Sequence, residues 1–315
     1  MLKNILIIAA IAVAVFFGGK AALHYRIATA LDAGIEGASP FVTASYKTVT
    51  SDVDGTVGIR GISISPAGTD DVFEIAELSI KFPDIWYLWE IEEQLSKAIL
   101  PERLEFNMLG FTVDPDGELL QQQEQAMIES EGHAVLAGNC VARSLNLLST
   151  QSDLGYRKVV FDATGGFKFV DSEFSVFGHY KQHDAESADI EITFPEVTNN
   201  MTSVMVALSD PTLLRAKVTL KDEGLRDRIY GYCESLEGLD RKQVNELLEA
   251  ELVARSMRFG IMPDEPILKS YREYLGGGET FTVTSAPWNP QKFSNMSLFD
   301  PADMPDLLNL NAHVR

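Results

Sequence analysis

The feature of this sequence that most restricts its fold is a series of segments with an apolar residue at every second position. Two examples are LSIKFP at 78–83 and IEITFP at 190–195. Successive side chains of a strand point to opposite sides, so this alternation predicts strands with one buried face. Turn-forming residues recur about every 8–14 positions between 158 and 220, a spacing typical of antiparallel sheets.

In three neighbouring segments the alternation slips by one residue. The slips occur at 60–61, between residues 75 and 78, and at 109–110. A slip sends every later side chain to the other face unless the strand contains a bulge. We therefore expect aligned bulges and a strongly curved sheet.

The first group of predicted strands covers 41–51, 56–66, 73–83 and 103–115. Asp54-Gly55 favours a type I′ hairpin turn between the first two, because both central residues of that turn need positive φ. A helix is predicted over 84–100 with Asp84 as its N-cap. The later strands, between 158 and 220, include SVMVALS at 203–209, and Gly165-Gly166 is interpreted as a turn.

After residue 222 the apolar period becomes helical. Asp240 and Gln243 predict a capping box at the start of a long helix, and three glycines at 276–278 are expected to end the helix that follows. A strand is expected next, and the tail from 300 is either a short helix or extended. No low-complexity linker divides the chain. These patterns predict a single α+β domain over 25–315, which is β-rich over 38–220, helical over 222–278 and closed by a terminal strand over 279–290.

The N-terminus, MLKNILIIAAIAVAVFFGGK, is strongly apolar. Three interpretations are open: an uncleaved signal anchor, a cleaved signal peptide and a buried core helix. Fifteen helical residues span only about 22 Å, whereas the hydrocarbon layer is about 30 Å thick. Lys20 can snorkel and the alanines after it extend the apolar length. The signal anchor, a transmembrane helix over 1–24 with residues 5–23 in the membrane, is the favoured interpretation. The chain from Arg26 onward is then expected outside the cytoplasm, which the resemblance described below places in the periplasm, beyond a bacterial inner membrane.

The charge of the chain restricts its partners. It has 46 acidic and 26 basic residues, a formal net charge of −20, and its few basic runs are interleaved with acids. The negative electrostatic field of so acidic a chain repels the phosphate backbone of nucleic acids, so no nucleic-acid partner is expected.

Cys140 and Cys233 are the only cysteines. In an oxidising compartment they could form a disulfide whose loop of about 90 residues would stabilise the fold by up to about 4–5 kcal/mol. Two buried free thiols are the alternative. Neither cysteine belongs to a C-x-x-C motif, which leaves zinc binding and redox chemistry without support.

No set of residues with the spacing of a catalytic site is found. His179 and His183 are the only histidines near one another in sequence, and they bracket a predicted hairpin turn rather than lying on one helix face. We therefore expect no metal, no cofactor and no enzymatic activity.

The predicted helix over 84–100 carries WYLW at 86–89. Trp89 fits a core stripe with Leu88, whereas Trp86 and Tyr87 fall off that stripe. They could contact a second layer, lie at a membrane interface or line a groove for an acyl chain. Trp86, Tyr87 and Trp89 are the candidate ligand-binding residues.

The apolar N-terminus followed by DGTVGIRGISISP, LSIKFPDIWYLWEI and RLEFNMLGFTVDP resembles the opening of AsmA-like envelope proteins. The later segments resemble uncharacterised single-span proteins of Gram-negative bacteria. The resemblance implies one inner-membrane span, a periplasmic chain of bent strands with an apolar groove, and a role in lipid handling or envelope maintenance. The alternative is a scaffold of the envelope that has a closed core, binds a protein partner and holds no ligand.

Overall fold

A computed structural model describes residues 24–29, 31–52, 54–122, 125, 139–146, 150–296 and 298–315. The chain is an α+β protein built on one large antiparallel sheet, as the alternation predicts. The anchor expected over 1–24 lies almost entirely outside the described residues. Within those residues, no helix has the length and apolar character needed to cross a bilayer.

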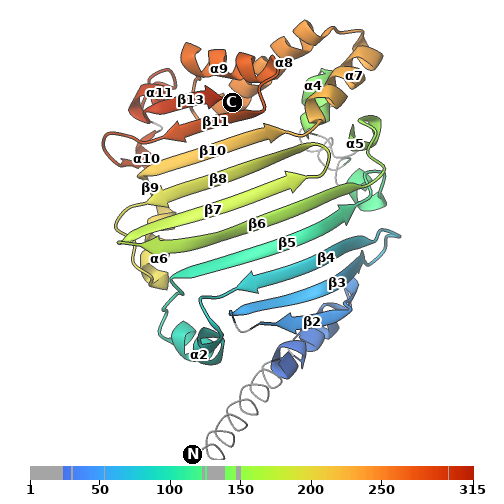
Figure 1. The fold of residues 1–315 in the computed structure, drawn as a ribbon, viewed down its shortest axis with the longest axis vertical. Helices are drawn as coiled ribbons and strands as arrows, with labels where there is room; N and C mark the ends of the chain where they lie inside the picture. The colour runs from blue at the N-terminus through green and yellow to red at the C-terminus, as the bar shows by residue number, and fades with distance from the viewer. Residues whose placement is uncertain are drawn as a thin grey trace, which may run out of the picture.

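The sheet is antiparallel, and its strands lie side by side in the order in which they occur in the chain, with β2, β9 and β12 off this path (Figure 1). The order is β1-β3-β4-β5-β6-β7-β8-β10-β11-β13, and β2 also pairs with β3. Its strands are β1 Val42–Ser45, β2 Thr48–Ser51, β3 Thr56–Pro66, β4 Phe73–Lys81, β5 Arg103–Val113, β6 Val159–Val170, β7 Glu173–Gln182, β8 Glu186–Phe194, β10 Arg215–Asp222, β11 Thr280–Ser285 and β13 Leu310–Val314. A small separate sheet pairs β9 (Thr212–Leu213) with β12 (Gln291–Lys292).

The register places apolar residues opposite apolar residues across the sheet. Ile59 pairs with Leu78, Leu78 with Met108, and Met108 with Ala163. One face of the sheet is therefore apolar along this row from β3 to β6, because the side-chain period of every strand is two.

The three phase slips align in one row. The pairing on either side puts Gly61 opposite Ala76, and Ala76 opposite Gly110. Because β3, β4 and β5 slip together, their mutual register is unchanged. Strand β6 does not slip, so the register shifts by one residue between Met108 and Phe111, and the backbone N–H of Gly110 donates to Asp162 Oδ1 at 2.7 Å. The expected bulges thus reduce to one register-changing bulge, at β5–β6.

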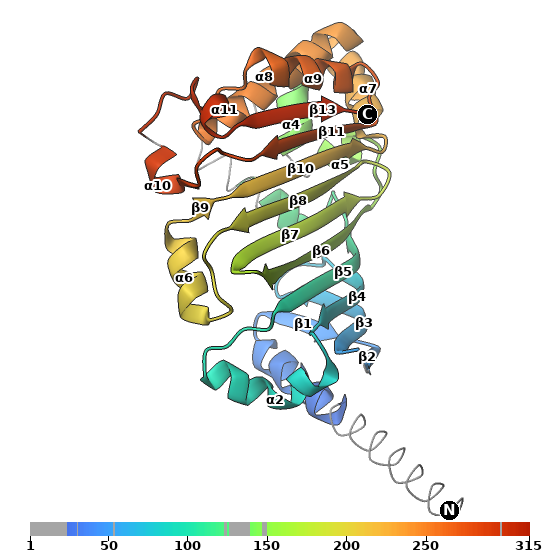
Figure 2. The ribbon, with the colours of Figure 1, turned by 60° about the vertical axis from the view of Figure 1, so that its left-hand side comes forward.

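The helices cover parts of the apolar face (Figures 1 and 2). Helical residues 24–29 and 31–38 and α2 lie at the β1–β4 end, whereas α7, α8 and α9 lie at the β13 end. The other helices in the described part of the chain are α4 Cys140–Asn146, α5 Thr150–Asp153, α6 Met201–Ser209, α7 Leu225–Glu237, α8 Arg241–Arg258, α9 Glu265–Leu275, α10 Phe293–Met296 and α11 Met304–Leu307, and α2 covers Ile85–Ser96.

Several local predictions for helix ends are confirmed. Asp84 Oδ1 accepts a hydrogen bond from the backbone N–H of Tyr87 at 2.8 Å, as an N-cap should. The capping box of Asp240 and Gln243 is complete at α8. Helix α9 ends at Gly276, the first of the three glycines.

Three local predictions are wrong. The segment 203–209 belongs to helix α6, because Asn200 caps it and Val204 and Ala207, three residues apart, pack into the core together. The connection between β2 and β3 is longer than a type I′ turn: the N–H of Asp52 donates to the carbonyl of Thr56. Gly165-Gly166 is no turn, because both glycines lie inside β6.

Candidate functional site

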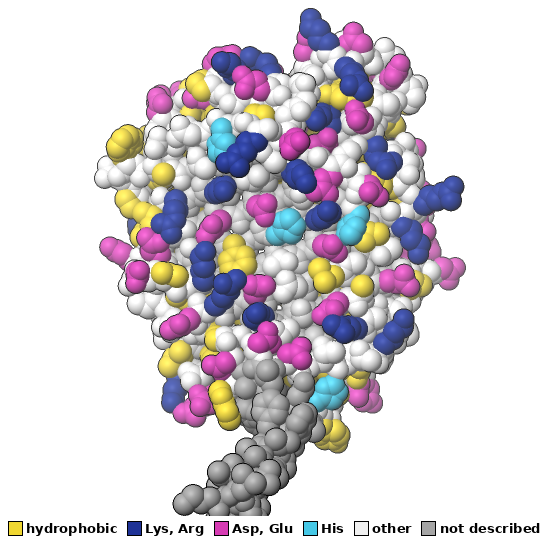
Figure 3. Space-filling model, in the orientation of Figure 1, with side chains coloured by type: hydrophobic (Ala, Val, Ile, Leu, Met, Phe, Trp, Pro, Cys, Tyr) yellow, Lys and Arg dark blue, Asp and Glu magenta, His cyan; other side chains and the backbone are white. Residues whose placement is uncertain are grey.

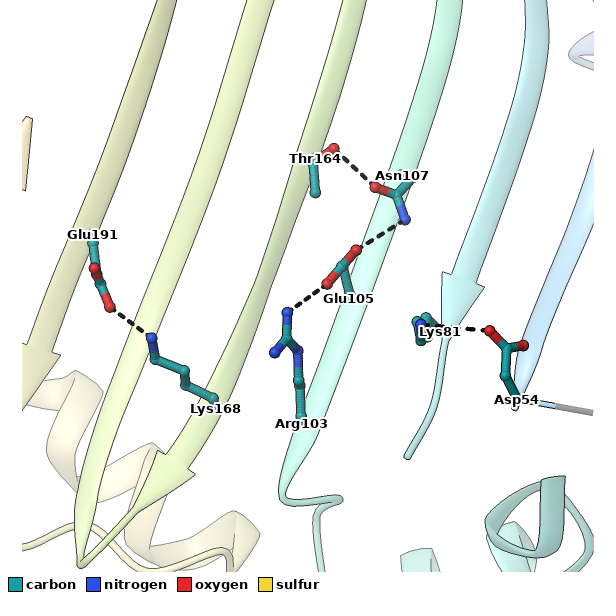
Figure 4. Close-up of polar contacts among 8 residues, drawn as sticks. All are labelled: Asp54, Lys81, Arg103, Glu105, Asn107, Thr164, Lys168 and Glu191. Carbon is teal, nitrogen blue, oxygen red and sulfur yellow. Dashed lines mark hydrogen bonds and ion pairs between the residues drawn. The ribbon is translucent and has the colours of Figure 1, made fainter. Parts of the chain in front are cut away.

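The polar face of the sheet is occupied by charges that neutralise one another. Figure 3 shows basic and acidic side chains interspersed over this face. Figure 4 shows the pairs in detail: Lys168 lies 2.8 Å from Glu191, and Arg103 lies 2.9 Å from Glu105. Lys168 lowers the pKa of Glu191 through a hydrogen bond and its charge. Exposed pairs of this kind contribute little free energy, and they leave no concentrated charge on this face for a ligand.

The apolar face contains a row that the helices leave open. Ile80 of β4, Phe106 of β5 and Ile190 of β8 lie in register across the sheet and keep 37–43% of their surface exposed. Gly165 of β6 and Gly178 of β7 stand between Phe106 and Ile190 in the same row. We call these five residues the open row.

The two glycines make a shallow floor in the middle of the open row. They pair directly with each other. A Cβ atom built on Gly165 or Gly178 would meet only a backbone oxygen, at 3.7 or 3.8 Å. Among the described residues, no side chain thus lies within 4 Å of either built Cβ atom. Glycine inside a strand often marks a place where another group approaches the backbone closely.

The open row lies between two buried clusters. Helix α6 covers the neighbouring row through a cluster that includes Phe167 and Ile192. Helices α7, α8 and α9 belong to a second cluster that includes Phe161 and Leu220, on the other side. The five residues of the open row belong to neither cluster. From β4 to β8 the row spans four strand spacings, about 19 Å.

The open row ends at a cavity beside α2. This cavity has a volume of about 320 Å³, and Ile80 contributes to its wall. Leu88 and Ile91 of α2 form another side of it, and Ile27 of the N-terminal helical residues a third. A further apolar cavity of about 200 Å³ lies under Leu31 and Ile35. The apolar face is therefore only loosely covered at this end.

The aromatic residues of α2 have separate environments. Trp86 is 71% exposed to solvent and does not line the cavity. The Tyr87 ring stacks on Phe82 with centroids 5.9 Å apart, and its buried hydroxyl has no hydrogen-bond partner among the residues described. Burial raises the pKa of this hydroxyl. The side chain of Trp89 lies outside what the structure describes.

The α2 residues that face the cavity are thus Leu88 and Ile91 rather than Trp86. The open row was missed in the sequence because Gly165 was interpreted as part of a turn. A signal was present: Gly165 and Gly178 occupy the phase of the apolar residues in their segments.

His179 and His183 pair with different carboxylates. His179 Nδ1 lies 2.9 Å from Asp189, and His183 Nε2 lies 2.8 Å from Asp162. His179 is part of β7, whereas His183 follows the end of that strand. Of the two histidines, only His183 therefore lies in the predicted turn. Across the described part of the chain, no group of three or more ligating side chains could hold a metal ion.

Cys140 and Cys233 form a disulfide that joins α4 to α7, with their Cα atoms 5.3 Å apart. Both cysteines are fully buried in the cluster beneath α7, α8 and α9. The bond ties together two helices that are separated by 93 positions in the sequence.

Comparison with known proteins finds one protein-family model, described as "Uncharacterized protein", which matches residues 159–315. No curated protein matches the chain. The matched segment starts at the first residue of β6. It contains one half of the sheet with α6 to α11, whereas β1 to β5 lie outside it.

Proposed function

We propose that this chain is a non-enzymatic envelope protein, anchored in a bacterial inner membrane by residues 5–23, that binds lipid or another apolar ligand on the periplasmic side. The main support for the proposal is the open row, in which partly exposed apolar side chains lie on both sides of a pair of glycines. An exposed apolar surface that is continuous with a cavity is typical of ligand grooves and interaction sites.

The shape of the open row favours an elongated ligand. It crosses five strands, and the cavity beside α2 lies at its β4 end, the end nearest the N-terminal helical residues. Apolar contacts would supply most of the binding energy, at roughly 25 cal/mol per Å² of surface removed from water. A resemblance to AsmA-like proteins agrees with this arrangement.

The experiment measures extraction of fluorescently labelled phosphatidylethanolamine from phosphatidylcholine vesicles by the full chain. This headgroup has no net charge, so the acidic protein does not repel it. Gly178→Leu places a side chain on the floor of the open row, and we expect at least a tenfold loss of extraction. His179→Leu is the matched control, because it adds the same side chain to the polar face of the same strand.

Equal extraction by wild type and Gly178→Leu would refute the open row as the lipid site. No extraction by the wild type, together with the absence of co-purified lipid in native mass spectrometry, would favour the alternative function. In that case the row is covered by a protein partner and the chain is an envelope scaffold.

A further inference from the structure

A third cavity lies at the other end of the apolar face, beneath α7, α8 and α9. Its volume is about 310 Å³, and leucine and isoleucine make half of its lining. Tyr271 and Tyr274 of α9 contribute aromatic rings. The volume is at the lower end of those of small-molecule sites.

Three carboxylates and two guanidinium groups line this cavity. Asp222 Oδ2 lies 3.4 Å from an Nη atom of Arg226, and both side chains are largely buried. Glu251 accepts a hydrogen bond from Arg255 Nε at 2.8 Å. Each arginine therefore already has a carboxylate. Glu186 is the remaining charged group in the lining.

The Glu186 carboxylate is compensated only in part, through the nearby charge of Arg255. It forms no hydrogen bond or ion pair within the described residues, and Asp222 lies opposite it in the β8–β10 register. Burial raises the pKa of Glu186, the charge of Asp222 raises it further, and Arg255 opposes both effects. Glu186 is partly buried, and a partly buried carboxylate without a hydrogen bond or ion pair is costly. A cation placed in the cavity would remove that cost.

We propose that this cavity binds a small organic monocation, with its ammonium group against Glu186 and its hydrocarbon part among the leucines and tyrosines. The ring of Tyr271 suits such a ligand, because a cation is attracted to the face of an aromatic ring. The ring of Tyr274 already has the Arg226 guanidinium 5.2 Å from its centroid, so it contributes apolar contact. A divalent metal fits poorly, since Ca²⁺ takes six to eight oxygen ligands and only one carboxylate here lacks a basic partner.

The site is separate from the open row. Glu186 and Ile190 lie on the same face of β8 but four residues apart, about 13 Å along the strand. Binding of a cation can therefore be measured whether or not the open row holds lipid.

The experiment titrates the full chain with 2-phenylethylammonium and with 2-phenylethanol, which has a similar shape and no charge. Calorimetry at pH 7 should show the wild type binding the ammonium probe at least tenfold more tightly. Glu186→Gln keeps the shape of the side chain and removes its charge, so its two affinities should become equal within about threefold. Asp189→Asn removes a carboxylate from the polar face of the same strand and should keep the wild-type ratio.

Equal affinity of the wild type for both probes, or no binding of either at millimolar concentration, would overturn the proposal. Retention of the tenfold ratio by Glu186→Gln would also overturn it. The wild-type comparison decides the question even where the variant does not fold.

Discussion

The two ends of the sheet have the same strand pattern but very different cover. At the β13 end, α4, α7, α8 and α9 enclose a large buried cluster that contains the disulfide. At the β1–β4 end, Val49 and Ile75 are the only buried apolar strand residues among those described. Cavities lie under the helices at both ends, so the difference lies in the size of the buried cluster. Alternation thus shows which face of a strand is apolar, but it does not show how much of that face is covered.

The largest effect is expected from removal of the disulfide. A double Cys140→Ser, Cys233→Ser variant should lose about 4–5 kcal/mol of unfolding free energy, because the bond closes a loop of 93 residues in the unfolded chain. Urea denaturation measures the loss. Hydrogen exchange should rise more in α4 and α7 than in β3 and β4; equal increases would contradict the contrast between the two ends.

Truncation of a phenylalanine should distinguish the covered face from the open row. Phe281 is buried and contacts Tyr271 and Tyr274, so Phe281→Ala should cost about 3–5 kcal/mol. Phe106→Ala in the open row should cost about 1 kcal/mol or less, because its ring is already partly in water. Denaturant midpoints measured on both variants test this, and similar losses would show that the open row is part of a packed core.

Two substitutions in α2 should have small effects. Tyr87→Phe removes a buried hydroxyl that lacks a partner, and we expect it to stabilise the protein by roughly 1 kcal/mol. Trp86→Ser should change the stability by no more than about 0.5 kcal/mol, since this residue is exposed. Thermal unfolding measures both. A loss of several kcal/mol in Trp86→Ser would place Trp86 in the core instead.

The smallest expected effect concerns pH. The folded state raises the pKa of Glu186 above its usual 4.5, so it holds this proton more tightly than the unfolded chain does. Stability is therefore lost as pH rises from about 4.5 through the raised pKa. Glu186→Gln should be more stable than wild type at pH 7, with the difference shrinking below pH 4.5. A constant difference across this range would show that Glu186 is not perturbed by folding.

The strands, their apolar face and the ends of several helices could be predicted from local patterns. The side-chain period of a strand and the caps of a helix depend on residues close in sequence, as in the alternation of 78–83 and the capping box of Asp240. Segment 203–209 was assigned wrongly because a short apolar run does not distinguish a strand from a helix.

The open row and the cavity at Glu186 depended on the tertiary structure. Gly165 and Gly178 are 13 positions apart and become neighbours only through the β6–β7 register. Glu186 lies opposite Asp222 because β8 pairs with β10. A local pattern states which side of a strand avoids water, whereas the packing of helices over that side decides where apolar surface and charge remain open to a ligand.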